Sequence, residues 1–469
     1  MTATAAPSPA VGHPLAGQAV HFNGLGGKGI APAAALALAA GMTVSGDDLS
    51  PNHRTSALAA AGADVTVGNN RTPVAGLHVA TAARPSTGVA GPLQMERLEF
   101  VQHLLAAHGK RQIAVAGSLG KSTAAAVLHQ VLAPTDPSAY IGADVPGLLC
   151  GATLTGGPWA VVEACEYRDA YSALAPEIAV ALNITSNHED HFGAGTGGFA
   201  RSLAGFLVAH PLRLAVMPAD VADLLQPHLR EAGTAPDIDT LGDDADWTVT
   251  ILDANPRGTV FVLDHHGRGV GTWTVPAPGR HLVTAAACAA ITSLHLGLTP
   301  ADSADALRGF RLPLRRMSTM HTDANLVVVD DNARQPDQIA ALIQGLRQAH
   351  PGRHLVLAVA PWGTRNKRDL DAWAPALAEA DTVWVLPVGP AAVPGGEDPD
   401  ADVRLANLIR LDGTPAYVAT PGVPLRQLLP AGRQPGPLLV TTAGYDASLT
   451  AFTGLHDQVI GTFADKAGA

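Results

Sequence analysis

Short apolar runs alternate with alanine- and leucine-rich helical segments over most of this 469-residue chain. In the segment 111–131, for example, the turn "GSLG" joins the apolar run "RQIAVA" to the helical pattern "KSTAAAVLHQV". Such alternation is typical of βαβ units, in which parallel strands form a sheet and helices cover its faces. The pattern restarts three times, each time with a loop of unusual chemistry. We therefore predict an α/β fold with three domains.

The predicted domain boundaries fall where a helical pattern ends and a new strand pattern begins. We expect a flexible N-terminus over 1–17, a Rossmann-like domain over 18–109, a central P-loop-type domain with a mainly parallel sheet over 110–313, and a C-terminal Rossmann-like domain over 314–469. Within the central domain, the residues 235–275 alternate between apolar and polar side chains. That period favours an antiparallel ribbon in this segment.

Charge and cysteine content exclude several classes of protein. The net charge is −11 and no lysine- or arginine-rich run stands out, which argues against partners that need a concentrated positive face, such as nucleic acid or a membrane surface. Cys150, Cys165 and Cys288 lie far apart and form no metal-spaced pair. The N-terminus lacks the pattern of a secretory signal, and the apolar stretches are too short to span a bilayer. We expect a soluble cytoplasmic protein.

The turn between the strand and the helix of segment 111–131 has the composition of a phosphate-binding loop. Gly117 and Gly120 let backbone amides approach an anion closely, and the helix N-terminus adds favourable partial charge. Lys121 adds a full positive charge, and Ser122 can reach a phosphate-bound magnesium ion. The alternative is a chance Gly-Lys-Ser turn. The candidate nucleotide-binding residues here are Gly117, Ser118, Gly120, Lys121, Ser122 and Thr123.

Acidic and imidazole side chains follow two later strands of the same predicted domain. Glu163 and Glu166 end the run "WAVVEACEY", and His188 follows the run "IAVALNITSN". In a parallel sheet, ligands bind beyond the carboxyl ends of the strands, where the phosphate loop also lies. These side chains could therefore complete a magnesium site. Individually, each could equally be an exposed loop charge.

The first predicted domain has a second glycine-rich loop. Gly24, Gly26 and Gly29 have G-x-G-x-x-G spacing after a strand, and Asp47 and Asp48 follow about 20 residues later. Alone, this pattern would indicate an NAD site, but nothing downstream resembles a hydride-transfer site. Its physical basis is backbone amides facing a pyrophosphate, which the pyrophosphate of UDP would satisfy equally well.

The order of these motifs resembles the Mur ligase family across nearly the whole chain. The series is "GSLGKST", "VVEACEY", "LNITSNHED", "PGRH", "LRRM" and "VVVDDNARQP". The starts "HFNGLGGKGIAPAA" and "VSGDDL" are similar to the UDP-binding region of the alanine-adding members, to which the chain looks closest. The segments "YIGADVPGLL" and "EACEY" are more similar to the muropeptide-recycling members.

The resemblance implies an ATP-dependent carbon–nitrogen ligase of peptidoglycan precursor synthesis, and hence a role in cell-wall biogenesis, cell shape and cell division. ATP would phosphorylate the lactyl carboxylate of UDP-N-acetylmuramate. The amine of an amino acid, by default L-alanine, would then attack the acyl phosphate. Because charge builds on phosphoryl oxygens, cations should do most of the catalytic work. ATP and Mg²⁺ are the implied cofactors.

The resemblance also implies a role for each candidate residue. Lys121 would hold the β- and γ-phosphates, and Ser122, Glu163 and His188 would hold magnesium. Arg316 of "LRRM" would reach the γ-phosphate, and Asp331 of "VVVDDN" would meet the ATP ribose; the alternative for these two is a simple interdomain ion pair. The residues that would hold UDP are Gly24, Gly26, Gly27 and Gly29, with Asp47 or Asp48.

Several motifs depart from the family pattern at positions that would receive the incoming amino acid. Arg334 and Gln335 replace two histidines of the alanine-adding members. In "PWGTRNKRD", Trp362, Gly363 and Asn366 replace a histidine and two arginines. Loss of an arginine is costly where a carboxylate must be bound by two parallel hydrogen bonds. A different amine or peptide acceptor is therefore the first alternative.

The region that would contact the adenine also differs from the family. In "GRHLVTA", Leu282 and Thr284 replace both asparagines of the family motif, so the hydrogen bonds of those amides are lost. The phosphate and magnesium motifs are better preserved than the motifs for base and amino-acid recognition. A catalytically weak, nucleotide-binding paralogue is therefore the second alternative.

Overall fold

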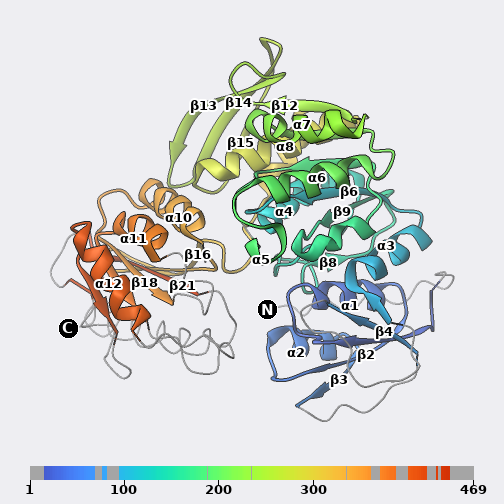
Figure 1. Ribbon diagram of the computed structural model, residues 1–469, viewed down its shortest axis with the longest axis horizontal. Coiled ribbons are helices and arrows are strands. Elements are labelled where there is room, and N and C mark those ends of the chain that lie inside the picture. The colour runs from blue at the N-terminus through green and yellow to red at the C-terminus, as the bar shows by residue number, and fades with distance from the viewer. Residues whose placement is uncertain are drawn as a thin grey trace. The chain divides into compact units, whose positions relative to one another are not determined.

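The computed structural model has three β-sheets with helices packed on them (Figure 1), which confirms the predicted α/β class. The domain boundaries stay a prediction. The chain divides into two compact units, the second comprising Leu314–Ala469 with the short segments Ala254–Gly258 and Ala277–Arg280. The structure describes residues 15–68, 76–81, 94–186, 188–233, 235–333, 335–360, 370–386, 400–419, 429–430 and 435–443. Most of the expected flexible N-terminus, 1–14, lies outside them.

The first sheet has five parallel strands in the order β3-β2-β1-β4-β5. Its strands are β1 (Ala19–Asn23), β2 (Thr43–Asp48), β3 (Asp64–Val67), β4 (Leu77–Ala80) and β5 (Gln94–Glu96). Its helices are α1 (Ile30–Ala39), α2 (His53–Ala60) and α3 (Arg97–Ala107). Asn52 begins α2 with a capping box, in which its side chain accepts hydrogen bonds from the helix amides and Thr55 bonds back.

The central sheet has ten strands in the order β15-β14-β13-β12-β11-β10-β6-β9-β7-β8. They are β6 (Arg111–Ala116), β7 (Ser138–Tyr140), β8 (Ala152–Thr153), β9 (Trp159–Glu163), β10 (Ile178–Ala181), β11 (Leu214–Pro218), β12 (Asp237–Leu241), β13 (Trp247–Asn255), β14 (Gly258–His265) and β15 (Arg268–Val275). The helices are α4 (Lys121–Val131), α5 (Glu189–Phe192), α6 (Gly197–Val208), α7 (Ala219–Ala232), α8 (Arg280–His295) and α9 (Pro300–Arg308), with 3₁₀ segments Ala133–Thr135 and Tyr167–Ala173.

The expected antiparallel ribbon at 235–275 is only partly correct. Strands β14 and β15 pair antiparallel, as predicted. Strand β12, however, pairs parallel with β11 and extends the parallel part of the central sheet. The alternating pattern is compatible with either direction, because alternation fixes which side chains share a face and leaves the direction of the partner strand open.

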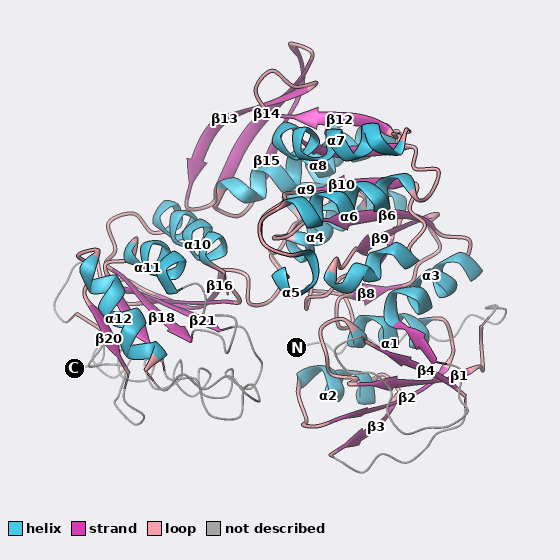
Figure 2. Cartoon of the chain, in the orientation of Figure 1, coloured by secondary structure: helices cyan, strands magenta, loops and turns pink. Residues whose placement is uncertain are grey.

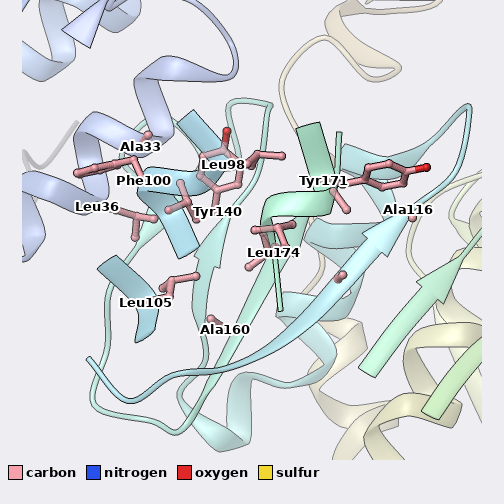
Figure 3. Packing of buried hydrophobic residues seen from close by; sticks show 14 of the residues in the cluster. Ala33, Leu36, Leu98, Phe100, Leu105, Ala116, Tyr140, Ala160, Tyr171 and Leu174 are labelled. Atoms are coloured by element: carbon pink, nitrogen blue, oxygen red, sulfur yellow. The ribbon is translucent and has the colours of Figure 1, made fainter. Parts of the chain in front are cut away.

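The first and central sheets share one hydrophobic core. Figure 3 shows side chains of α1 and α3 in the same buried cluster as side chains of β7 and β9. The labelled members from these four elements are Ala33, Leu36, Leu98, Phe100, Leu105, Tyr140 and Ala160. Because α1 is apolar on nearly all sides and contacts both sheets, the glycine loop that precedes it is held firmly in place.

The second compact unit contains a six-stranded sheet in the order β16-β17-β21-β18-β19-β20 (Figure 2). Its strands are β16 (Ser318–Thr322), β17 (Val327–Asp331), β18 (Leu355–Ala360), β19 (Thr382–Val385), β20 (Ala416–Val418) and β21 (Leu438–Ala443). Only the β16–β17 pair is antiparallel among the described pairs. The core of this unit contains strand residues such as Val327, Val329 and Leu355. Buried residues of its helices pack into the same core; the helices are α10 (Pro336–Ala349), α11 (Leu370–Ala378) and α12 (Ala401–Leu411).

Candidate active site

Three neighbouring strands of the central sheet bring the predicted phosphate and magnesium residues to one edge. Strand β6 lies between β9 and β10, and all three run parallel. The chain continues to β9 and β7 on one side of β6 and to β10 and β11 on the other. Such a reversal of strand order opens a crevice at the carboxyl ends of the strands. The phosphate loop, Glu163 and the segment before His188 all leave the sheet at this edge.

The phosphate loop is held in place by Asn183, which follows β10. The Asn183 side chain accepts a hydrogen bond from the Leu119 amide at 2.8 Å and donates one to the Leu119 carbonyl at 2.9 Å. Its main-chain carbonyl accepts from the Ser118 amide at 3.1 Å. Gly117 and Gly120 both have positive φ, of 138° and 80°, which favours glycine at these positions. The loop is thus held by contacts with the protein itself.

Lys121 lies at the first turn of α4, with its side chain mostly buried. Its Nζ donates to the carbonyl of Gly117 at 2.7 Å and lies 2.8 Å from the Glu166 carboxylate. Burial alone lowers the pKa of Lys121, but the negative charge of Glu166 outweighs it and the net shift is upward. The lysine therefore carries its positive charge at the loop.

Ser122 and Glu163 form a pair of oxygen donors beside the loop. The Ser122 hydroxyl donates to Oε1 of Glu163 at 3.0 Å. The other oxygen, Oε2, accepts from the Gly142 amide at 2.7 Å. A hydroxyl and a carboxylate at this separation are the hard donors that Mg²⁺ prefers. The donor set therefore fits the ion expected from the sequence.

His188 lies at the same edge, with its Nε2 3.5 Å from Oε1 of Glu166. Its ring packs against Tyr167, with ring centroids 4.9 Å apart. Burial acts to raise the pKa of Glu166, but the charge of Lys121 and the hydrogen bond with His188 outweigh it and hold that pKa at about 2. Glu166 thus connects two predicted site residues through one carboxylate.

The second glycine loop lies at the end of the first sheet, where its amides donate to the last residues of β2. The Gly24 and Leu25 amides donate to the Asp47 carbonyl at 2.8 and 2.9 Å. The Gly26 amide donates to the Asp48 carboxylate at 2.8 Å. The structure therefore brings the predicted glycines and both aspartates together, but Asp48 contacts the loop itself.

Larger side chains cover two of these glycines. A Cβ at Gly26 would overlap Nδ2 of Asn52, and one at Gly29 would overlap Nη1 of Arg97. Gly27 lies between them, and its amide donates to the Gly24 carbonyl at 2.9 Å. Sequence reasoning did not assign Asn52 or Arg97 to the site.

A partly buried ion pair joins the first sheet's helix α2 to the segment that follows β7. Arg54 donates to Asp144 from Nε at 3.0 Å and from Nη2 at 2.6 Å, and Nε2 of His53 lies 2.9 Å from the same carboxylate. Burial acts to raise the pKa of Asp144, but these two partners outweigh it and lower it to about 2. The pair fixes the glycine loop relative to the central sheet.

Arg316 and Asp331 lie in the second compact unit. Asp331 is 6% exposed, and its carboxylate accepts from the amides of Met317 at 2.7 Å and Ala333 at 2.6 Å. Burial raises the pKa of Asp331, while the charge of Arg316 acts in the opposite direction. The neighbouring Arg315 pairs with Asp330 at 2.9 Å. Asp331 thus has a structural role that the sequence did not indicate.

Some predictions fall outside the described residues, namely Arg334 and the segment 361–369 with Trp362, Gly363 and Asn366. Leu282 is described and is a buried residue of α8. Within the described ranges, no group of three or more His, Cys, Asp or Glu side chains is arranged to hold a metal ion. No helix there is long and apolar enough to cross a membrane.

Comparison with known proteins gives family matches at both ends of the chain. Residues 19–110 match the model described as "Mur ligase family, catalytic domain", and residues 315–420 match "Mur ligase, glutamate ligase domain". The chain is 30% identical to the UDP-N-acetylmuramate–L-alanine ligases of Xanthomonas oryzae pv. oryzae and Xanthomonas campestris pv. campestris. In each case the alignment covers 94% of this chain and 96% of the relative.

Solved structures give the same fold. The UDP-N-acetylmuramate-alanine ligase of Thermotoga maritima has a TM-score of 0.78 at 21% identity, covering 95% of this chain and 99% of that one. A murein peptide ligase from Psychrobacter arcticus has a TM-score of 0.66 at 19% identity, covering 95% and 98%. At these identities the structures support the fold alone.

Proposed function

Because this chain belongs to the Mur ligase family, we propose that it is an ATP-dependent ligase that joins UDP-N-acetylmuramate to L-alanine in peptidoglycan precursor synthesis. The observation that carries this proposal is the meeting of Lys121, the Ser122–Glu163 pair and His188 at the carboxyl ends of three adjacent strands. A lysine, hard oxygen donors and an imidazole at one end of the sheet suit phosphoryl transfer from a nucleoside triphosphate.

The proposed reaction has two steps. A carboxylate oxygen of the lactyl group attacks the γ-phosphorus of ATP, and the bond to the bridging oxygen of ADP breaks. The amine of L-alanine then attacks the acyl carbon, and inorganic phosphate leaves from the tetrahedral intermediate as the amine loses a proton. In both steps negative charge develops on phosphoryl oxygens, so fixed positive charge at those atoms lowers the barrier.

Lys121 and the start of α4 are the fixed charges that we assign to ATP. The first-turn amides of a helix have no partner within the helix and point toward an anion beyond its N-terminus. In the structure Lys121 contacts the Gly117 carbonyl and Glu166. We propose that ATP phosphates replace the carbonyl contact and that Glu166 keeps the ammonium at the loop.

The Ser122 hydroxyl and the Glu163 carboxylate would hold Mg²⁺, and His188 would complete the site from the neighbouring strand end. When bound, the ion would neutralise charge on the phosphate oxygens. The Gly142 amide holds Glu163 in position at 2.7 Å, so this carboxylate is oriented by the protein itself.

We assign the second glycine loop to the UDP part of the substrate. A UDP phosphate that used the Gly26 amide would replace the Asp48 carboxylate, which accepts from that amide in the structure. In the second compact unit, Arg316 is proposed for the γ-phosphate and Asp331 for the ATP ribose. A carboxylate has about four acceptor positions, so Asp331 can accept two amides and still meet a ribose hydroxyl.

A second candidate acceptor, a peptide or another amine, is favoured by one observation. Gln335 replaces a histidine of the alanine-adding members. Trp362, Gly363 and Asn366 also differ from the residues of those members. This candidate changes the amine and leaves the ATP and UDP-sugar chemistry unchanged.

The experiment supplies purified protein with ATP, Mg²⁺ and UDP-N-acetylmuramate, together with single amino acids and Ala-Glu-type peptides, and measures phosphate release. Release with L-alanine supports the proposal. Release only with a peptide or an unusual amine supports the second candidate. Binding of the UDP-sugar without release in any mixture would contradict both and favour a nucleotide-binding paralogue.

A further inference from the structure

One buried carboxylate, Glu166, contacts two residues of the proposed site. Its Oε2 lies 2.8 Å from Nζ of Lys121, and its Oε1 lies 3.5 Å from Nε2 of His188. The residue is 2% exposed. Lys121 comes from the loop after β6, Glu166 from the segment after β9 and His188 from the segment after β10. A single side chain thus connects the ends of three strands.

We infer that Glu166 is a positioning residue, which orients His188 toward the proposed magnesium site and holds Lys121 at the phosphate loop. This inference rests on the proposed function. Glu166 itself touches neither the nucleotide nor the metal in this account. It acts through its two partners.

Glu163 and Glu166, the two acids of "EACE", have different neighbours, which supports a different role for each. Glu163 bonds to the Ser122 hydroxyl and the Gly142 amide, so it faces the proposed metal donors. Glu166 instead faces an ammonium and an imidazole, and its side chain is 3% exposed. A carboxylate enclosed in this way by two cationic or proton-donating groups is suited to orienting them.

The chemistry of histidine ligands explains why this orientation matters. A metal-binding imidazole commonly donates its other N–H to a carboxylate, which fixes the tautomer and the direction of the ring. When Nε2 carries the proton toward Glu166, Nδ1 is the acceptor nitrogen of the ring. The contact with Glu166 therefore selects the nitrogen that would face the metal.

Residues near Glu166 have strained backbone conformations. Arg168 and Asp169 have φ of 53° and 55°, and His188 has φ of 52°, a region that non-glycine residues seldom adopt. Between Glu166 and this strained pair, Tyr167 packs its ring on His188. Strained residues persist where the surrounding contacts over-determine them, and they concentrate at functional sites. Glu166 and Tyr167 thus both contact the His188 ring.

The test compares Glu166→Gln with wild type by calorimetric binding of a non-hydrolysable ATP analogue over a series of Mg²⁺ concentrations. We expect the half-saturating Mg²⁺ concentration to rise about 10- to 100-fold, as for loss of other groups that orient metal ligands. Without Mg²⁺, binding of the analogue should weaken by a smaller factor, because Lys121 loses one of the contacts that hold it at the loop. The matched control is Glu177→Gln, which changes an exposed ion pair with Arg111 and should leave the Mg²⁺ dependence unchanged.

A double-variant cycle separates positioning from general damage. In a His188→Ala background, Glu166→Gln should raise the Mg²⁺ requirement no further, because the residue it orients is gone. Thermal unfolding and UDP-sugar binding show whether each variant is folded. If Glu166→Gln is unfolded, Glu166→Asp replaces it, with a smaller increase in the Mg²⁺ requirement expected.

Each outcome has a definite meaning. An unchanged Mg²⁺ requirement in the folded variant, or an equal increase with and without His188, overturns the inference. Wild-type protein that binds the nucleotide in a Mg²⁺-dependent way but releases no phosphate contradicts the proposed function and leaves this inference standing. Wild-type protein that binds no nucleotide contradicts both.

Discussion

The two glycine loops of the first compact unit have the same local form and different charged neighbours. Each follows a parallel strand and precedes an alanine-rich helix, α1 in one case and α4 in the other. At α4 the loop carries Lys121, with Glu163 and Glu166 close by. At α1 the Gly26 amide donates to the Asp48 carboxylate, and Arg54 and Arg97 lie beside the loop. The backbone shape of such a loop is enough to bind an anion, and the neighbouring side chains determine which anion binds.

The largest expected effect comes from removing the lysine at the start of α4. Lys121→Ala should lower turnover by about a thousand-fold or more, because the ammonium that would hold the β- and γ-phosphates is lost. The UDP-sugar should bind as in wild type, since its proposed loop lies at α1. Steady-state phosphate release and calorimetric binding measure the two effects. Near-normal turnover would show that the site is assigned wrongly.

Glu163→Gln probes the metal side of the same loop. Loss of the carboxylate charge should lower kcat by about 100-fold, comparable to loss of other groups that stabilise a transition state. Added Mg²⁺ should restore part of the rate, because the Ser122 hydroxyl remains. A full rate at ordinary Mg²⁺ concentrations would remove Glu163 from the metal site.

Asp144→Asn tests the ion pair that fixes the α1 loop to the central sheet. The change leaves the buried Arg54 without its charged partner and should lower the free energy of unfolding by about 2–4 kcal/mol. The matched control Asp305→Asn breaks an exposed pair with Arg308 and should change stability by less than about 1 kcal/mol. Equal losses in chemical denaturation would show that the Arg54–Asp144 pair has no special role.

The pH dependence of stability should report the same pair. The folded pKa of Asp144 is about 2, below its ordinary 3.8. A lowered folded pKa stabilises the protein fully above the unfolded value, and this stabilisation is lost as the pH falls from about 4 to about 2. Asp144→Asn should show a smaller loss of stability over that range. Identical slopes in wild type and variant would contradict this assignment.

Gly26→Ala should have the smallest effect of the set, on the α1 loop alone. Its Cβ would overlap the Asn52 side chain, so that side chain must move, at a cost of about 1–3 kcal/mol. UDP-sugar binding should weaken while binding of the ATP analogue stays unchanged. The control is Gly205→Ala in α6, where a Cβ meets nothing within 4 Å and stability should rise slightly. Weakened binding of both ligands would mean that the two loops are not independent.

Local sequence patterns predicted the strand–loop–helix units and the strand ends that carry Lys121, Glu163 and His188. Their meeting follows from parallel strands sharing one edge. Contacts between distant segments could not be predicted in this way. Asn183 holds the phosphate loop through 2.8 and 2.9 Å contacts, and nothing in the sequence around it indicates that partner.

The same limit applies to carboxylates. Asp48 was predicted at the right place, but its bond to the Gly26 amide depends on the turn geometry. Asp331 ends a predicted strand, yet its two amide contacts arise from how the segments before β16 and after β17 fold beside it. A motif gives the type of side chain and its strand end, and tertiary packing decides which group it contacts.

The most direct test follows oxygen from the sugar carboxylate during turnover. UDP-N-acetylmuramate labelled with oxygen-18 in its lactyl carboxylate is incubated with ATP, Mg²⁺ and L-alanine, and the released phosphate is analysed by mass spectrometry. Activation as an acyl phosphate at the α4 loop predicts one labelled oxygen in each phosphate, and no labelled phosphate with Lys121→Ala. Unlabelled phosphate at the wild-type rate would show that water attacks ATP and would contradict the ligase mechanism.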